Sequence, residues 1–168
     1  SEKDLDEADK QLFAKTINQS CDLLLVLIND ILEVSRLQSG QMKFEKESCS
    51  VKELVDDLYL AHQLLVPTHL RFSKEAEGDL FIYTDKKRLS QVITNFLTNA
   101  CKFTNSGYIK LGFKHLRGTD EVAIFVEDSG IGLSEEQQEK VFSRFFKQDE
   151  FSQGAGLGLS ICQGIVQN

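Results

Sequence analysis

Hydrophobic side chains recur every three or four residues near the start of the chain, and no Pro or Gly interrupts residues 4–38. This pattern predicts one long helix over residues 4–38. Its apolar stripe consists of Phe13, Ile17, Cys21, Leu24, Ile28 and Ile31. Over residues 23–28 (LLLVLI), apolar surface surrounds the whole circumference. A helix of this kind needs cover on several sides, so we expect a helical bundle; packing only against the following domain is the alternative.

The segment after this helix predicts a second, shorter one. Gly40 ends the long helix, and an extended stretch leads to Ser50. Ser50 is expected to cap the new helix, with Glu53 completing a capping box. Pro67 is expected to end it, because proline cannot continue a helix.

Strand and helix patterns then alternate. Short strands are expected at residues 70–76 and 80–84, joined near Gly78, and a helical pattern runs from Asp85 to residue 104. The apolar face of that helix would consist of Leu89, Val92, Ile93, Phe96 and Ala100.

The last third of the chain contains two further strand patterns and a helix. Residues 108–116 alternate apolar and polar side chains, which predicts a strand with one buried face. Residues 121–128 are apolar on both faces, so we expect a central strand there. Residues 134–153 are polar and aromatic, and the third helix of the domain begins near residue 157. The fold class expected is α+β: a two-layer α/β sandwich, its mixed sheet covered by helices on one face, preceded by one long helix.

Composition narrows the function classes. The 168 residues carry a net charge of −7, which argues against a general nucleic-acid-binding protein. The four cysteines, like the three histidines, lie far apart, without the spacing of a metal or disulfide framework. Buried thiols in a reducing cytosol are therefore expected. The longest apolar run is too short to cross a bilayer, so any membrane anchor is expected outside this chain.

A polar stripe on the helix from Asp85 is the first candidate for chemistry. Asn95, Asn99 and Lys102 fall on one side of this helix, and Arg88 and Gln91 continue the stripe. Amide oxygens can bind Mg²⁺ and a lysine can neutralise a phosphate. A solvated helix face is the alternative, but asparagine is a poor helix former and two in mid-helix need a reason.

A second candidate follows the strand at residues 121–128. Asp128 ends this strand, and Gly130 and Gly132 allow a tight turn after it. A carboxylate there could accept a hydrogen bond from an exocyclic amine such as that of adenine. Asp and Gly also occur in turns for conformational reasons alone, so this signal is weak by itself.

The third candidate is the run QGAGLGLSICQ, with Gly154, Gly156 and Gly158 at alternate positions. Backbone amides at the start of a helix suit an anion, whereas a simple hinge is the alternative. The run matches neither a Walker loop nor a dinucleotide-binding fingerprint. Together, a magnesium stripe, an adenine acceptor and a phosphate loop describe an ATP site without a Walker motif.

At this point the chain resembles the catalytic ATP-binding domain of sensor histidine kinases, within the GHKL (Bergerat-type) ATPase group. NFLTNACKF resembles the asparagine box, DSGIG the first glycine box, VFSRFFKQD the phenylalanine box and GAGLGLSICQGIV the second glycine box. Residues 1–40 resemble the second helix of the dimerisation bundle, and residues 41–168 the catalytic domain.

The resemblance implies a role for each matching position. Asn99 would be the main Mg²⁺ ligand, with Asn95 assisting, and Lys147 would reach the γ-phosphate from a lid over residues 133–155. Asp128 would bind the adenine amine. The other ATP-binding positions implied are Lys102, Phe103, Gly130, Gly132, Gly154, Gly156, Leu157 and Gly158.

The chain departs from the family pattern in two places. No histidine has the H-E-x-x-x-P context of the phosphoacceptor, so we expect that the chain alone cannot phosphorylate itself. The terminal pair of strands is not found either, which would leave an exposed sheet edge.

The function expected from the resemblance is transfer of the ATP γ-phosphate to a histidine, and then to a response-regulator aspartate, in the cytoplasm. A homodimer through the bundle helices is also implied. An ATPase switch of the same fold and a non-enzymatic dimerisation scaffold are the alternatives. An ATPase switch usually has glutamate where Asn95 stands.

Overall fold

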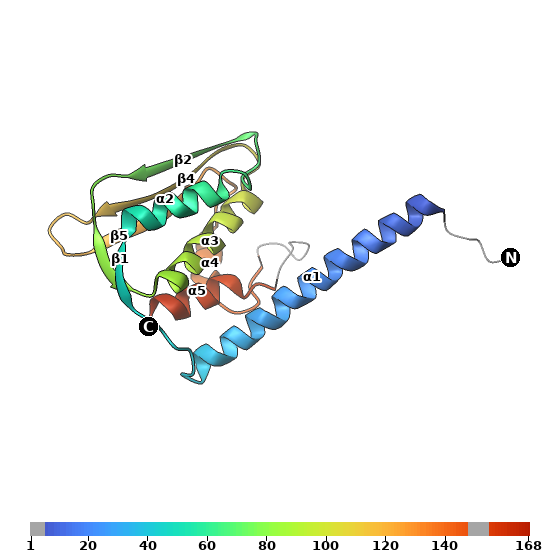
Figure 1. The fold of residues 1–168 in the computed structure, drawn as a ribbon, viewed down its shortest axis with the longest axis horizontal. Coiled ribbons are helices and arrows are strands. Elements are labelled where there is room, and N and C mark those ends of the chain that lie inside the picture. The colour runs from blue at the N-terminus through green and yellow to red at the C-terminus, as the bar shows by residue number, and fades with distance from the viewer. Residues whose placement is uncertain (1–5, 148–154) are drawn as a thin grey trace.

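The computed structural model describes residues 6–147 and 155–168, in which one long helix projects from a compact domain (Figure 1). Helix α1 spans Glu7–Gln38, so the long helix is confirmed, with its start three residues later than predicted. The Asp6 carboxylate caps it by accepting a hydrogen bond from the amide of Asp9 at 2.7 Å. It ends at Ser39, and Gly40 takes a positive φ of 65° that suits glycine after a helix.

A mixed sheet forms one layer of the domain. Strands β2 (Leu70–Ala76), β4 (Gly107–His115) and β5 (Val122–Asp128) lie in the order β2-β4-β5. β2 pairs with β4 in parallel, and β4 pairs with β5 antiparallel. A separate two-stranded sheet pairs β1 (Glu47–Ser50) with β3 (Phe81–Thr84). The mixed sheet is confirmed, although β2 and β3 belong to different sheets.

The prediction that residues 121–128 form a central strand is wrong for the part of the chain that the structure describes. β4 is central and β5 lies at the edge. Ile124 and Val126 pack on the main core, while Phe125, on the opposite face, lies beside Gly112 of β4. The apolar side chain on the opposite face therefore lies over a glycine of the neighbouring strand and does not indicate a second neighbouring strand.

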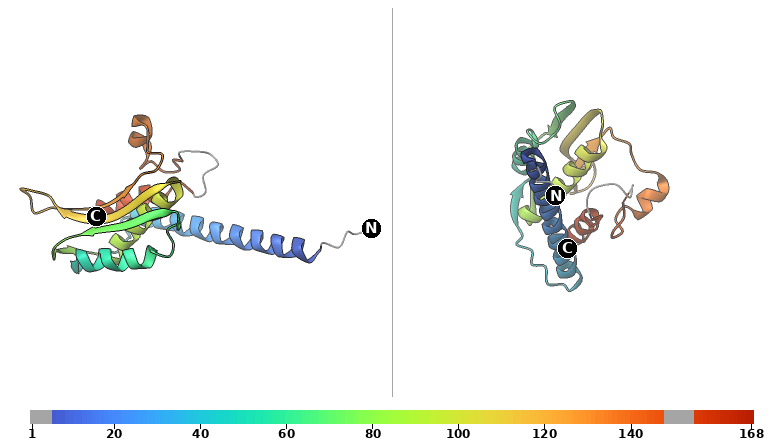
Figure 2. Two further views of the ribbon diagram at one scale, coloured as in Figure 1. Left: turned by 90° about the horizontal axis from the view of Figure 1, so that it is seen from above. Right: turned by 90° about the vertical axis from the view of Figure 1, so that its right-hand side faces the viewer.

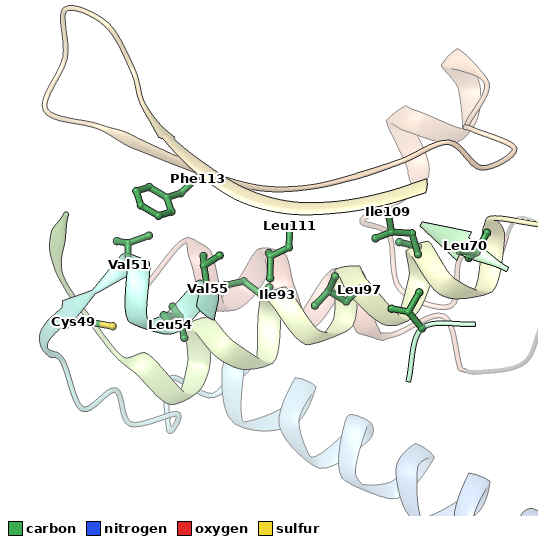
Figure 3. Packing of buried hydrophobic residues seen from close by; sticks show 12 residues of the cluster. Cys49, Val51, Leu54, Val55, Leu70, Ile93, Leu97, Ile109, Leu111 and Phe113 are labelled. Carbon is green, nitrogen blue, oxygen red and sulfur yellow. The ribbon is translucent and has the colours of Figure 1, made fainter. Parts of the chain in front are cut away.

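Helices α2 (Val51–His62) and α3 (Lys86–Phe103) cover one face of this sheet, as predicted. Figure 3 shows Ile109 and Leu111 of β4 pointing toward these helices. The Ser50 cap is present, because its hydroxyl accepts from the Glu53 amide at 3.2 Å. Helix α2 nevertheless ends at His62, well before Pro67. The His62 carbonyl there accepts two turn bonds, from Leu65 and Val66.

The predicted apolar face of α3 is largely correct. Val92, Ile93 and Ala100 are buried, whereas Phe96 is 36% exposed. Leu97, which the pattern did not select, is fully buried instead. The buried face is thus wider than the predicted stripe, because α3 packs against α2, the sheet and α5.

A second hydrophobic cluster joins α1 to the domain. It surrounds α5 (Gly158–Val166), the last predicted helix, and contains Met42, Val92, Leu157, Ile161, Cys162 and Ile165. Val34 and Leu37 of α1 pack against it. The rest of α1 projects away from the domain (Figure 2). Most of its apolar side chains stay exposed, so the domain covers only the C-terminal part of the helix.

Between β5 and α5, the described residues include the short helix α4 (Glu135–Lys140). Ser134 and Gln137 form a reciprocal capping box at its start. Among the residues that the structure describes, no helix combines the length and apolarity needed to cross a membrane.

Candidate nucleotide site

A cavity of about 500 Å³ opens between α3, the end of β5, the α4 segment and the start of α5. Side chains and backbone from distant parts of the sequence meet here. The residues singled out from the sequence that line it are Asn95, Asn99, Lys102, Phe103, Asp128, Gly132, Lys147, Gly156 and Gly158. A larger cavity of about 690 Å³ lies elsewhere along α3 and β5, but none of these residues lines it.

The polar stripe of α3 is divided into two parts. Arg88 and Gln91, nearest the start of the helix, bind Glu33 of α1 through an ion pair and a 2.5 Å hydrogen bond. Arg88 also donates to Gln91 at 3.0 Å. Asn95 and the residues after it face the cavity instead. The stripe thus holds α1 at one end and lines the candidate site at the other.

Asn95 is enclosed by α5. Its Nδ2 donates a hydrogen bond to Sγ of Cys162 at 3.0 Å. Gly158 lies so close that an added Cβ would sit 2.7 Å from Nδ2 and 2.8 Å from Oδ1. No larger residue fits at position 158 unless the Asn95 amide moves.

Two cations face the cavity. Burial and the positive charge of Lys147 both lower the pKa of Lys102. Like charges brought together at a partly buried site favour a bound anion, because the anion relieves both their repulsion and their desolvation.

The Asp128 carboxylate is positioned by the turn that follows β5. Its Oδ1 accepts from the Gly130 amide at 2.8 Å and from the Thr104 hydroxyl at 3.4 Å. An added Cβ at Gly130 would sit 2.5 Å from the Phe103 carbonyl oxygen. Gly130 therefore allows a close backbone approach that fixes Asp128, but it does not itself line the cavity.

The glycine run contributes backbone. Gly156 has φ 69°, and an added Cβ there would lie 2.5 Å from the Phe146 carbonyl oxygen. Gly154 lies outside the described residues. Leu157, expected at the ATP site, is 2% exposed and packs in the second cluster. Its side chain therefore packs into the second cluster, while the neighbouring Gly156 and Gly158 line the cavity.

Helix α1 also reaches this cavity, which the sequence did not indicate. Val26 and Asp30 contribute to its wall. Burial, together with the nearby Glu33, raises the pKa of Asp30. No local motif marks these residues, because their position depends on how α1 docks through Glu33.

Comparison with known families agrees with this geometry. Residues 84–168 match the family described as histidine kinase-, DNA gyrase B- and HSP90-like ATPase. The chain belongs to this family.

Within this ATPase family, the chain is similar to sensor histidine kinases. It is 36% identical to the sensor histidine kinase RcsC of Escherichia coli K12 over 159 residues, which are 89% of this chain and 16% of that protein. The crystal structure of full-length ShkA in complex with AMPPNP superposes with a TM-score of 0.83 at 26% identity. It covers 98% of this chain and 35% of ShkA.

Histidine kinase ThkA in complex with the response regulator TrrA gives a TM-score of 0.75 at 26% identity, over 98% of this chain and 46% of ThkA. The chain spans about half or less of the length of the first curated relatives that it matches. Both structural matches include α1 as well as the domain.

Proposed function

We propose that this chain is the ATP-binding core of a protein-histidine kinase in a two-component system. It would bind Mg–ATP and transfer the γ-phosphate to a histidine on a helix that this chain does not supply. The phosphate would then pass to an aspartate of a response regulator. The observation that carries the proposal is the convergence of the amides, lysines, Asp128 and glycines on one cavity of about 500 Å³.

The residues at the cavity fit a magnesium ion. Asn99 would be the principal ligand and Asn95 would assist, because hard Mg²⁺ prefers oxygen donors. The described residues contain no cluster of three His, Cys, Asp or Glu suited to a metal. Nucleotide phosphates and water would therefore complete the coordination, which is usual for Mg²⁺. The ion would supply charge neutralisation between the phosphates.

The remaining groups would position the nucleotide. Lys102 and Lys147 would hold the phosphates, and Asp128 would accept a hydrogen bond from the adenine amine. Phosphoryl transfer needs mainly positioning and charge stabilisation, which these groups provide. Phe103 would pack beside the nucleotide, and Gly130 and Gly132 would shape the base pocket. Gly154, Gly156 and Gly158 would hold the phosphates, with Leu157 packed behind this loop.

The exposed apolar surface of α1 supports a homodimer through bundle helices. Phe13, Ile17, Leu24, Ile28 and Ile31 are each about half exposed in this chain. A contiguous apolar face of this kind usually marks an interface. The structure of ThkA with its response regulator supports a similar partner for this chain. The need for ATP supports a cytoplasmic location, and any membrane anchor would lie outside this chain.

Titration calorimetry with AMPPNP, with and without Mg²⁺, tests the binding site. We expect the chain to bind the analogue, and Asn99→Ala to lose most of the Mg²⁺-dependent affinity. Asn105→Ala is the matched control, because Asn105 is exposed just beyond α3 and lies outside the cavity. Binding that is equally weak in both variants would contradict the assigned metal position.

Phosphotransfer needs a second assay. Incubation with labelled ATP and a separate bundle-helix protein that carries a phosphoacceptor histidine should give acid-labile phosphohistidine. ATP turnover without any phosphoprotein would favour an ATPase switch instead. Absence of nucleotide binding would favour a non-enzymatic scaffold.

A further inference from the structure

The Asn95 side chain lines the cavity, and contacts with two residues of α5 also fix the orientation of its amide. The side chain lies between Gly158, at the first turn of α5, and Cys162, one turn later. Cys162 is 3% exposed and belongs to the second hydrophobic cluster. A polar amide is thus held against a buried sulfur by the helix that follows the glycine loop.

The hydrogen bonds around this sulfur have a direction. Cys162 is buried, and a cysteine thiol has one hydrogen to donate. Its Sγ lies 3.9 Å from the Val92 carbonyl oxygen, which can only accept. The sulfur lone pairs therefore remain to accept the N–H of Asn95. Because the Val92 carbonyl can only accept, it fixes the direction of both hydrogen bonds: Cys162 donates to Val92, and Asn95 donates to Cys162.

This direction determines which atom of Asn95 the cavity receives. With Nδ2 engaged by Cys162, the remaining polar atom of the amide is Oδ1. An amide turned the other way would place its oxygen against the sulfur and present N–H groups to a cation. N–H groups cannot ligate Mg²⁺, so the orientation matters to any ion bound there.

We propose that Cys162 is a positioning residue that holds the Asn95 amide with its oxygen directed to the metal side of the nucleotide site. This inference rests on the proposed function, since it assigns Asn95 a part in binding Mg–ATP. Gly158 contributes by leaving space for the amide in this orientation. Cys162 itself contacts neither nucleotide nor ion.

The test compares three variants of the full chain. Cys162→Ala removes the acceptor, and Cys162→Ser keeps a donor and an acceptor in the same place. Cys49→Ala is the matched control, because Cys49 is equally buried at 4% exposure but lies in the main core, away from the site. For each variant, AMPPNP affinity is measured by calorimetry with Mg²⁺ and with EDTA, and the ratio of the two affinities is taken.

We expect this ratio to fall roughly three- to tenfold in Cys162→Ala, the range that one oriented hydrogen bond contributes. Cys162→Ser and Cys49→Ala should keep the wild-type ratio, although Cys49→Ala loses stability. An unchanged ratio in Cys162→Ala, or an equal fall in Cys49→Ala, overturns the inference.

A second measurement needs no nucleotide. The Asn95 side-chain amide pair is identified in ¹H–¹⁵N spectra by its loss in Asn95→Asp. We expect this pair to shift in Cys162→Ala and to stay in place in Cys49→Ala. An unmoved pair in Cys162→Ala overturns the positioning role. If the pair shifts in Cys162→Ala while the wild-type chain binds no Mg–nucleotide, the result supports the amide orientation and contradicts only the proposed function.

Discussion

The two hydrophobic clusters of this chain contain similar side chains but are stabilised differently. The cluster between the sheet and helices α2 and α3 contains fully buried Leu54, Leu97 and Leu111. The cluster at the α1 junction is smaller, and α1 adds only half-buried Val34 and Leu37 to it. Polar bonds from Glu33 supplement that contact. The comparison teaches that the domain depends on its interior packing, whereas the docking of α1 depends on a few specific contacts.

The largest effect is expected from the main core. Leu111→Ala should lower the free energy of unfolding by about 2–5 kcal/mol, since it leaves a cavity in a fully buried site. Urea denaturation followed by circular dichroism measures this change. Leu64→Ala is the control: its side chain is 94% exposed, and we expect a change within about 0.5 kcal/mol. Equal losses in the two variants would contradict the assignment of the core.

A smaller effect is expected when the polar contact of α1 is broken. Glu33→Gln should weaken docking by about 1–3 kcal/mol, because Arg88 loses its charged partner at a site that is only about one-fifth exposed. Hydrogen exchange should then rise in α1 and α5 and stay constant in β4. Glu7→Gln, which alters an exposed pair on the same helix, should change neither. Faster exchange throughout the sheet would show that the two regions are not separable.

Gly164 offers a finer test of the junction. An added Cβ would meet Cδ1 of Leu37 at 2.9 Å, but that flexible end can move. Alanine also gains about 1 kcal/mol of helix propensity, so Gly164→Ala should change global stability by less than about 1 kcal/mol. Gly112→Ala in β4 is the contrasting variant. Its Cβ would meet the Glu75 carbonyl oxygen at 2.6 Å, and thermal melting should show a clear loss.

The smallest effect concerns the surface charge of Asp56. Hydrogen bonds from Lys74 and Lys52 lower the pKa of this carboxyl in the folded state. A lowered folded pKa means that the stabilisation is present above the unfolded value of about 3.9 and is lost as pH falls through the folded value. The stability difference between wild type and Asp56→Asn should thus be constant above about pH 5 and shrink below pH 4. A difference that grows on acidification in urea titrations would refute this sign.

Much of the domain followed from local patterns. The alternation of Ile109, Leu111 and Phe113 correctly assigned one buried face, and β2 was predicted to the residue. These features depend on nearest neighbours in sequence. The edge position of β5 and the early end of α2 depend on pairing and turn bonds with distant or competing groups, which periodicity does not record.

The candidate site likewise contains some residues that the sequence indicated and others that only the structure revealed. Asn99 could be selected from sequence because asparagine is unusual in mid-helix, whereas Asp128 and Gly156 were weak signals alone and were selected through their combination and the resemblance. Their convergence on one cavity needed the fold. Asp30 could not be selected, since an acidic residue on a solvated helix carries no signal until the helix docks. The role of Leu157 stays a prediction: its side chain packs in the second cluster, and a motif position does not specify which way a side chain points.

The polar stripe of α3 places the residues that bind α1 close to the residues that line the candidate nucleotide site. Gln91, which binds α1, and Asn95, which faces the cavity, are four residues apart, a rise of about 6 Å along one rigid rod. A tilt of α1 that displaces Glu33 therefore acts on the turn adjoining the candidate metal ligand. Such a movement would change the surroundings of a bound phosphate directly through α3, without any change in the sheet.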